Sequence, residues 1–152
     1  MATTSPITVT VDSKVTIRYV NSEAYVLLLL RSPTAQTHPL EWGNPAGHID
    51  PGETPLVTAR RELAEETGLR VATASLTPIG VERFDEGYNQ YEINLFATLL
   101  NRGRKPDIRI SDEHLAFGFF KYRTVRRTPG IVPMTAYIYK KWQSALDKLV
   151  YA

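Results

Sequence analysis

The chain has 152 residues, of which 43% are hydrophobic and 22% are charged, and its formal net charge is +2. These values are ordinary for a globular protein and argue against a long acidic tail or a strongly basic nucleic-acid surface. No cysteine is present, which excludes disulfides and thiolate metal sites and fits the cytoplasmic location that we expect. The longest apolar run, Ala24 to Leu30, is too short to span a membrane. We therefore expect one domain over residues 1–152, with a homodimer left open.

The first part of the chain is expected to form strands. Ile7 to Val20 alternates and is rich in Thr, Val and Ile, which predicts one strand, or two with a turn near Asp12–Ser13. After a turn signal at Asn21–Ser22, the unbroken apolar run from Ala24 to Leu30 predicts a central strand buried on both faces. A loop follows, and we expect Trp42 to belong to the core.

A helix is expected between Thr54 and Gly68. Thr54 can cap its start, Pro55 suits the first helical position, and Gly68 can end it. Apolar residues at helical spacing make one face of this helix. The side chains that we expect in the core are Leu56, Ala59 and Leu63 from the helix and Val26, Leu28 and Leu30 from the preceding strand.

Three glutamates form an acidic arc on the same helix. Glu62, Glu65 and Glu66 stand at positions i, i+3 and i+4, so their side chains gather beside the apolar face. Like charges at this spacing repel by roughly 0.2–0.5 kcal/mol per pair. A hard divalent cation such as Mg²⁺, which carboxylates and phosphate oxygens bind together, would explain the arrangement. The alternative is a solvated glutamate-rich face without function.

Further strands follow the helix. Val71 to Arg83 predicts a strand interrupted near Pro78, Phe84 to Gln90 a hairpin loop, and Tyr91 to Leu100 the returning strand. A basic turn and a short extended piece over residues 107–112 come next.

The end of the chain is expected to contain a last strand and a second helix. His114 to Tyr122 predicts the strand, and Met134 to Leu149 predicts an amphipathic helix. The apolar face of that helix would carry Ile138, Trp142, Leu146 and Leu149. Strands mixed with two helices favour an α/β/α sandwich over a mixed central sheet.

The stretch from Gly47 to Leu69 carries a dense pattern. It reads Gly47, five other residues, Glu53, seven others, Arg61-Glu62-Leu63, one other, Glu65-Glu66, one other, and Gly68-Leu69. This stretch resembles the Nudix box, with every fixed position filled. The resemblance implies a Nudix-type fold and a nucleotide pyrophosphohydrolase. Such an enzyme hydrolyses a phosphoanhydride bond in a nucleoside diphosphate linked to another moiety.

The resemblance also implies a set of metal ligands. They are the carboxylates of Glu62, Glu65 and Glu66 and the main-chain carbonyl of Ala46, which would bind Mg²⁺ or, as an alternative, Mn²⁺. Glu53 and Arg61 are expected to hold the loop and the helix carboxylates in place.

The general base is left open between a box glutamate, Glu62 or Glu66, and an acid from a later loop. An acidic residue followed by His114 resembles family members that act on nucleoside triphosphates and dinucleoside polyphosphates. Glu113 is our candidate and Asp112 its rival, although either carboxylate could simply be a solvated loop residue.

A nucleobase needs a flat apolar partner, and a phosphate needs a cation. The aromatic candidates are Phe84, Tyr88, Tyr91 and Phe119, although core packing explains at least half of them. Arg83 is a candidate phosphate contact. Two further basic groups, for which a solvated turn is the simpler interpretation, are Arg102, Arg104 and Lys105, and Arg123, Arg126 and Arg127.

Several functions remain open at this point. A (d)NTP or related nucleotide is favoured, because Pro45–Ala46–Gly47 departs from the Pro-Lys-Gly or Pro-Gln-Gly of many dinucleoside polyphosphate hydrolases. A dinucleoside polyphosphate hydrolase is the first alternative. A catalytically silent nucleotide-binding domain is another, although such domains usually lose box glutamates and this chain keeps all of them. The basic groups leave an RNA-end pyrophosphohydrolase as a third alternative.

Overall fold

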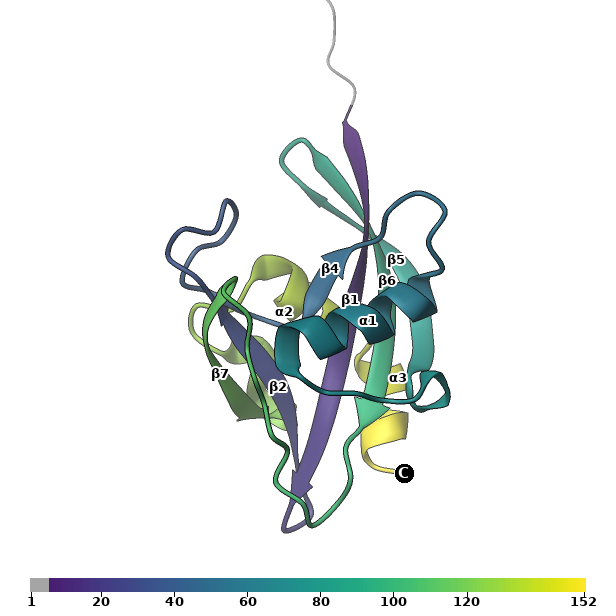
Figure 1. The fold of residues 1–152 in the computed structure, drawn as a ribbon, viewed down its shortest axis with the longest axis vertical. Helices are drawn as coiled ribbons and strands as arrows, with labels where there is room; N and C mark the ends of the chain where they lie inside the picture. Colours follow the sequence, from purple (N-terminus) through teal and green to yellow (C-terminus); the bar gives the residue numbers. More distant parts are fainter. Residues whose placement is uncertain (1–5) are drawn as a thin grey trace, which may run out of the picture.

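A mixed β-sheet forms the middle layer of the structure (Figure 1). The structure is a computed structural model that describes residues 6–152, so residues 1–5 of the expected domain lie outside the described residues. Within that range the sheet has seven strands, in the order β3-β2-β1-β6-β5, with β4 paired to β1 and β7 paired to β2. The strands are β1 (Ile7–Val20), β2 (Glu23–Arg31), β3 (Trp42–Gly43), β4 (Ala46–His48), β5 (Thr77–Glu86), β6 (Asn89–Leu99) and β7 (His114–Lys121).

Helices cover both faces of this sheet (Figure 1). The helix α1 (Pro55–Thr67) crosses the front face, where Ala59 packs with Leu76 and Phe96. The helices α2 (Pro133–Lys141) and α3 (Gln143–Val150) lie behind the sheet, and their buried side chains join the larger core. Short 3₁₀ segments at Thr73–Ser75 and Tyr122–Arg127 complete the elements. The expected α/β/α sandwich over a mixed sheet is confirmed, since β1 and β6 are parallel and the other pairs are antiparallel.

The strand β1 runs through the sheet without the turn considered near Asp12–Ser13. Its pairing with β6 is continuous from Ile7 to Ile17. Side chains at alternate positions of a strand point to opposite faces, so Asp12 and Lys14 both lie on the α1 face. Both are fully buried there. The alternative of a turn near Asp12–Ser13 was therefore wrong. Asp12 can be buried in the middle of a strand because it is paired with a charged side chain, Lys14.

The hairpin between β5 and β6 is tighter than expected. The two strands extend through residues 84–86 and 89–90, which leaves a two-residue turn at Gly87 and Tyr88. Gly87 has φ of 61°, which is what the first central position of a type II′ hairpin turn takes. The expected interruption near Pro78 is present as a register shift between Pro78 and Gly80. The preceding residues 71–76 were wrongly assigned to this strand.

The C-terminal helical segment is broken where one helix was expected. It begins at Pro133, and α2 and α3 are separated at Trp142, whose φ and ψ are −100° and 19°. The apolar face is as expected, because Ile138 and Leu146 are buried and Trp142 packs partly against the same core. Among the described residues, none of the helices combines the length and hydrophobicity that crossing a bilayer requires.

The expected core is largely confirmed. Val26, Leu28, Ala59 and Leu63 are fully buried. The side chains of Leu30 and Leu56 are only partly buried. Trp42 also packs against the core, in an edge-on contact with Phe120 at 4.9 Å between ring centroids.

The helix α1 has the ends that its sequence predicts. Thr54 stands at the N-cap position in an extended conformation and Pro55 is the first residue, but the expected capping hydrogen bond from the Thr54 side chain is not formed. At the other end, Gly68 has φ of 76° and its N–H donates to the carbonyl of Ala64. A left-handed glycine of this kind ends a helix sharply.

Packing of α1 on the sheet can be tested at Leu63. Leu63→Ala removes buried methyl groups and leaves a cavity, so we expect the free energy of unfolding to fall by about 2–5 kcal/mol. Val57→Ala on the same helix is the control, because the Val57 side chain is 57% exposed. The control should change stability by less than about 0.5 kcal/mol. Chemical denaturation measures both, and equal effects would contradict the packing described here.

Candidate functional site

A cleft of about 640 Å³ opens between α1, β4 and the loops that follow β2 and precede β7. Its acidic side is formed by Glu62, Glu65 and Glu66 of α1. Its other walls bring together residues that are far apart in the sequence, including Leu29, Tyr91, Glu113 and Met134. A volume of this size suits a small-molecule ligand.

The loop that enters the box is anchored by one buried asparagine. The side-chain amide of Asn44 donates to Ser13 Oγ at 3.2 Å, and its oxygen accepts from Tyr139 Oη at 2.7 Å. The N–H of Asn44 donates to Thr135 Oγ1 at 3.1 Å. Because β4 pairs with residues 11–13 of β1, this anchoring places Ala46 beside the end of α1. The Ala46 N–H donates to Glu66 Oε2 at 3.4 Å.

Gly47 is required by the position of Glu62. A Cβ atom at Gly47 would collide with the carboxylate of Glu62. The box glycine therefore allows a helix carboxylate to lie directly against the β4 backbone. The sequence pattern predicted a close backbone approach at this point, and the structure identifies what approaches.

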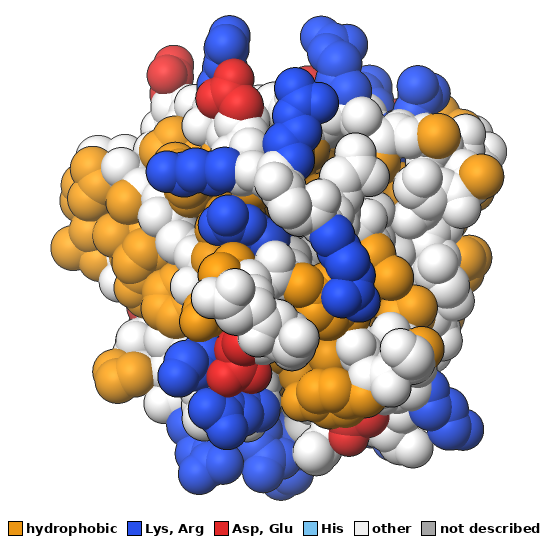
Figure 2. Space-filling view, turned by 90° about the horizontal axis from the view of Figure 1, so that it is seen from below, with side chains coloured by type: hydrophobic (Ala, Val, Ile, Leu, Met, Phe, Trp, Pro, Cys, Tyr) orange, Lys and Arg blue, Asp and Glu red, His pale blue; other side chains and the backbone are white. Residues whose placement is uncertain are grey.

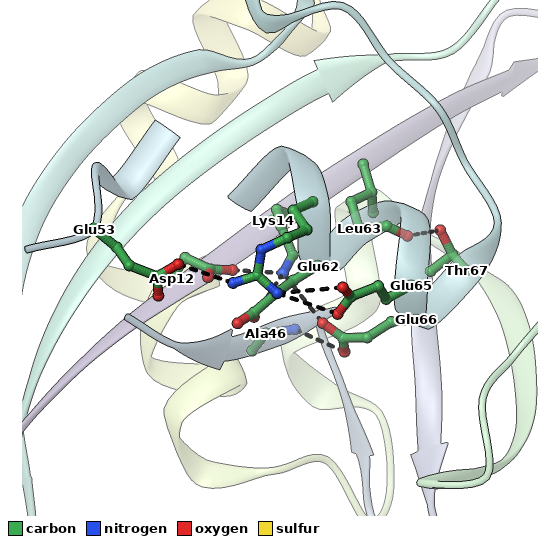
Figure 3. Close-up of polar contacts among 10 residues, drawn as sticks. Asp12, Lys14, Ala46, Glu53, Glu62, Leu63, Glu65, Glu66 and Thr67 are labelled. Atoms are coloured by element: carbon green, nitrogen blue, oxygen red, sulfur yellow. Dashed lines mark hydrogen bonds and ion pairs between the residues drawn. The ribbon is translucent and has the colours of Figure 1, made fainter. Parts of the chain in front are cut away.

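A buried lysine lies among the carboxylates, and the sequence analysis missed it. The ammonium of Lys14 is 2.5 Å from Asp12 Oδ1, 3.3 Å from Glu66 Oε1 and 3.9 Å from Glu62 Oε2. Figure 3 shows these side chains converging between β1 and α1. Lys14 and Asp12 are fully buried, while Glu66 is nearly so. The available signal was a pair of opposite charges two residues apart in an otherwise apolar strand.

Burial and charge act in opposite directions at this cluster. Burial raises the pKa of Glu62 to about 8 and that of Glu66 to about 7. Burial alone would lower the pKa of Lys14, but the carboxylates of Glu66 and Asp12 raise it above its usual value. Lys14 is therefore a charged ammonium. The carboxylates of Asp12, Glu62 and Glu66 can carry more negative charge than this one ammonium offsets, so a further cation would stabilise their charged forms.

A second arrangement holds the outer side of α1. Arg61 Nη2 donates to Glu53 Oε2 at 3.0 Å, and Arg61 Nη1 donates to Glu65 Oε1 at 3.2 Å. Glu53 also accepts from the N–H of Asp50 at 2.9 Å, and these contacts hold the pKa of Glu53 below its usual value. The Arg61 guanidinium thus connects Glu53 of the box loop with Glu65 of the helix, which is the contact expected from the sequence.

The donor set fits a hard divalent cation. Buried carboxylate oxygens without a hydrogen-bond partner remain on Asp12 and Glu62, and Ala46 and Gly47 of β4 line the same cleft. Oxygen ligands of this kind suit Mg²⁺ or Mn²⁺. Across residues 6–152, no three acidic or histidine side chains are already arranged around a common metal position. Lys14 lies where such side chains would otherwise face one another.

The expected substrate contacts are dispersed. Among the described residues, Tyr91 is the only one of the five candidates that lines the cleft. Phe84 packs on Tyr137 in the core at 5.0 Å between ring centroids, and Phe119 lies under the guanidinium of Arg18. Tyr88 is exposed at the hairpin tip. Arg83 is paired with Asp85 at 2.9 Å.

The later loop contributes one of its two candidate acids. Glu113 lines the cleft, whereas Asp112 is exposed outside it. His114 also lines the cleft, and burial lowers its pKa below the usual value. Arg31 is a cleft residue that the sequence analysis missed. Its Nε donates to the carbonyl of Thr37 at 2.7 Å, which orients the guanidinium at the wall.

The two basic groups lie outside the cleft. Figure 2 shows the lower end of the molecule, where Lys and Arg side chains are spread over the surface. Within the part of the chain that the structure describes, their members are exposed and none lines the cleft: Arg102, Arg104, Lys105, Arg123, Arg126 and Arg127. Arg102 stacks over the ring of Tyr19 at 4.1 Å, a contact typical of an ordered surface side chain.

Two curated proteins illustrate what the sequence is similar to. The asymmetrical bis(5'-nucleosyl)-tetraphosphatase of Mus musculus is 33% identical over 95 residues, which cover 59% of this chain and 60% of that protein. The m7GpppN-mRNA hydrolase NUDT17 of Xenopus laevis is 38% identical over 71 residues, which cover 47% of this chain and 24% of that protein. The chain therefore spans less than two thirds of the length of these relatives.

Solved structures share the fold at low identity. The MutT protein from Methanosarcina mazei Go1 has a TM-score of 0.77 at 18% identity, covering 95% of this chain and 99% of that one. A C. elegans Ap4A hydrolase binary complex has a TM-score of 0.71 at 21% identity, covering 92% of this chain and 98% of that one. A family profile described as the NUDIX domain matches residues 13–139, which include the complete box. The chain therefore belongs to the NUDIX domain family, whose curated relatives named above are hydrolases.

Proposed function

We propose that the protein is a hydrolase that depends on a divalent metal, with Mg²⁺ as the expected ion. It would cleave a phosphoanhydride bond in a nucleoside diphosphate linked to another moiety. The observation that carries this proposal is the pair of buried, incompletely bonded carboxylates on Asp12 and Glu62 beside a cleft of about 640 Å³. A bound divalent cation would neutralise phosphate charge and lower the pKa of its water.

The residues of the chain divide this work between them. Glu62 and Glu66, with the carbonyl of Ala46, would hold the cation. Glu65 would be a further ligand on the exposed side of the cleft. Arg61 and Glu53 would keep the helix and the box loop in register. Glu113 lies across the cleft and stays our candidate for accepting a proton from water.

The substrate would be bound by the other walls. Arg31 is the arginine available to a phosphate in the described part of the cleft, and Tyr91 offers a ring to a base. The departure of Pro45–Ala46–Gly47 from the Pro-Lys-Gly or Pro-Gln-Gly of many dinucleoside polyphosphate hydrolases supports a (d)NTP or a related nucleotide. The curated tetraphosphatase relative supports the alternative, a dinucleoside polyphosphate.

Product analysis separates these possibilities. The purified protein should be incubated with Mg²⁺ and a panel of dNTPs, ADP-ribose, diadenosine tetraphosphate and capped RNA. Metal-dependent release of a nucleoside monophosphate and pyrophosphate from a dNTP supports the first substrate class, and asymmetric cleavage of the tetraphosphate supports the second. Binding of nucleotides without any turnover would support the silent binding domain and contradict the proposal.

The role of Glu66 gives the sharpest test of the metal site. Glu66→Gln keeps the size of the side chain but removes a charge that a hard cation needs, so we expect kcat to fall by at least ~10²-fold. Because burial disfavours the charged form of Glu66, the metal-free melting temperature should not fall. Glu92→Gln on the exposed part of β6 is the control and should retain full turnover. Turnover of Glu66→Gln at the level of the control would reject the metal-ligand assignment.

Arg61 tests the connection between the box loop and the helix. Arg61→Lys keeps the positive charge but loses the planar group that bonds Glu53 and Glu65 together. We expect activity to fall by about 10–100-fold with little change in melting temperature, because these side chains are largely exposed. The neighbouring Arg60→Lys is the matched control. If both variants keep wild-type activity, the bridge from Arg61 is not needed.

A further inference from the structure

Lys14 is a buried cation for which the family resemblance provides no role. It lies on β1, outside the box, and its side chain is fully buried. An isolated charge of this kind is costly to bury, and it persists only when it is paired. Its partners are carboxylates of two different elements, Asp12 of its own strand and Glu66 of α1.

The charges of the cluster balance in a specific way. Asp12, Glu62 and Glu66 can carry three negative charges, and the ammonium of Lys14 offsets one of them. One divalent cation offsets the remaining two. A second divalent cation in the same cluster would leave the buried site with an excess of positive charge, which desolvation disfavours.

The position of Lys14 agrees with this balance. Its ammonium lies within 4.0 Å of one oxygen from each of the three carboxylates, as a bound cation would. Asp12 is its closest partner, and the other oxygen of Asp12 has no hydrogen-bond partner. Asp12 thus holds the ammonium from the strand side, while Glu62 keeps an unpartnered buried oxygen on the helix side.

We propose that Lys14 is a built-in cation of the carboxylate cluster, which offsets one of its three negative charges in the metal-free protein and weakens its binding of a divalent ion. Lys14 is a positioning residue under this proposal and does not touch the substrate. The proposal rests on the proposed function to the extent that the cluster binds a divalent metal.

The test measures the number and affinity of bound metal ions together with the stability of the metal-free protein. Lys14→Met removes the charge and keeps an unbranched apolar side chain. Wild-type protein should bind one Mn²⁺ per cluster, and Lys14→Met should bind that ion at least ~10-fold more tightly because a nearby positive charge is gone, as measured by electron paramagnetic resonance of free Mn²⁺. The metal-free melting temperature of Lys14→Met should fall by on the order of 10 °C, and Mn²⁺ should restore most of it.

Two further variants separate charge from packing. Asp12→Asn combined with Lys14→Met removes one charge of each sign, so it should bind one Mn²⁺ and recover much of the metal-free melting temperature. Thr16→Val changes a buried side chain on the same face of β1 without changing charge, and it should keep the wild-type count and affinity. If Lys14→Met does not fold without metal, the double variant with Asp12→Asn and Lys14→Met shows whether the loss of folding comes from charge or from packing. Failure of the double variant to fold would overturn the proposal, because the role of Lys14 would then be packing.

The outcomes distinguish this inference from the proposed function. One Mn²⁺ in both wild-type protein and Lys14→Met, with equal affinity and equal metal-dependent stabilisation, would overturn the role of Lys14 and leave metal-dependent hydrolysis intact. Absence of Mn²⁺ binding in both proteins would overturn both proposals. Binding of Mn²⁺ by Lys14→Met alone would support the role of Lys14 and contradict metal use by the wild-type protein.

Discussion

The electrostatic contact between β1 and α1 is the constraint on which the site depends. Glu62 and Glu66 project from the helix toward a strand that places Asp12 on the same buried face. Three carboxylates at this distance in a poorly solvated layer repel strongly, because little water screens them. Lys14 lies between these carboxylates and offsets one of their charges. The same contact therefore contributes to the fold and determines the charge that the site presents to a ligand.

The backbone around this contact is built to allow it. Gly47 has no side chain where the carboxylate of Glu62 lies, and Asn44 anchors the loop before β4 through three hydrogen bonds. Arg61 then holds the opposite side of α1 to the box loop. The arrangement of the carboxylates thus depends on one steric allowance, one buried asparagine and one guanidinium bridge.

The sequence predicted what depends on local patterns and missed what depends on pairing across the chain. The ends of α1 follow from Pro55 and Gly68, and the bridge from Arg61 to Glu65 follows from helical spacing. The role of Lys14 and Asp12 was missed because the glutamate that Lys14 also contacts, Glu66, lies 52 residues away, and only the pairing of β1 with β4 and the packing of α1 bring them together. For the same reason Phe84 was a substrate candidate, although its ring packs on Tyr137 of α2.

The cleft has a charged side and other walls that come from separate segments, and this division allows substrate preference to change independently of the charged side. The charged side comes from β1, β4 and α1, and under the proposed function it would carry out the part of the reaction that all phosphoanhydride substrates share. The other walls come from separate segments that supply Arg31, Tyr91, Glu113 and Met134. A change in one of these walls alters what fits beside the phosphates without disturbing the buried charges. Substrate preference can therefore diverge among proteins that keep the same box, which is why resemblance in the box indicates the reaction and leaves the nucleotide to be determined by the walls.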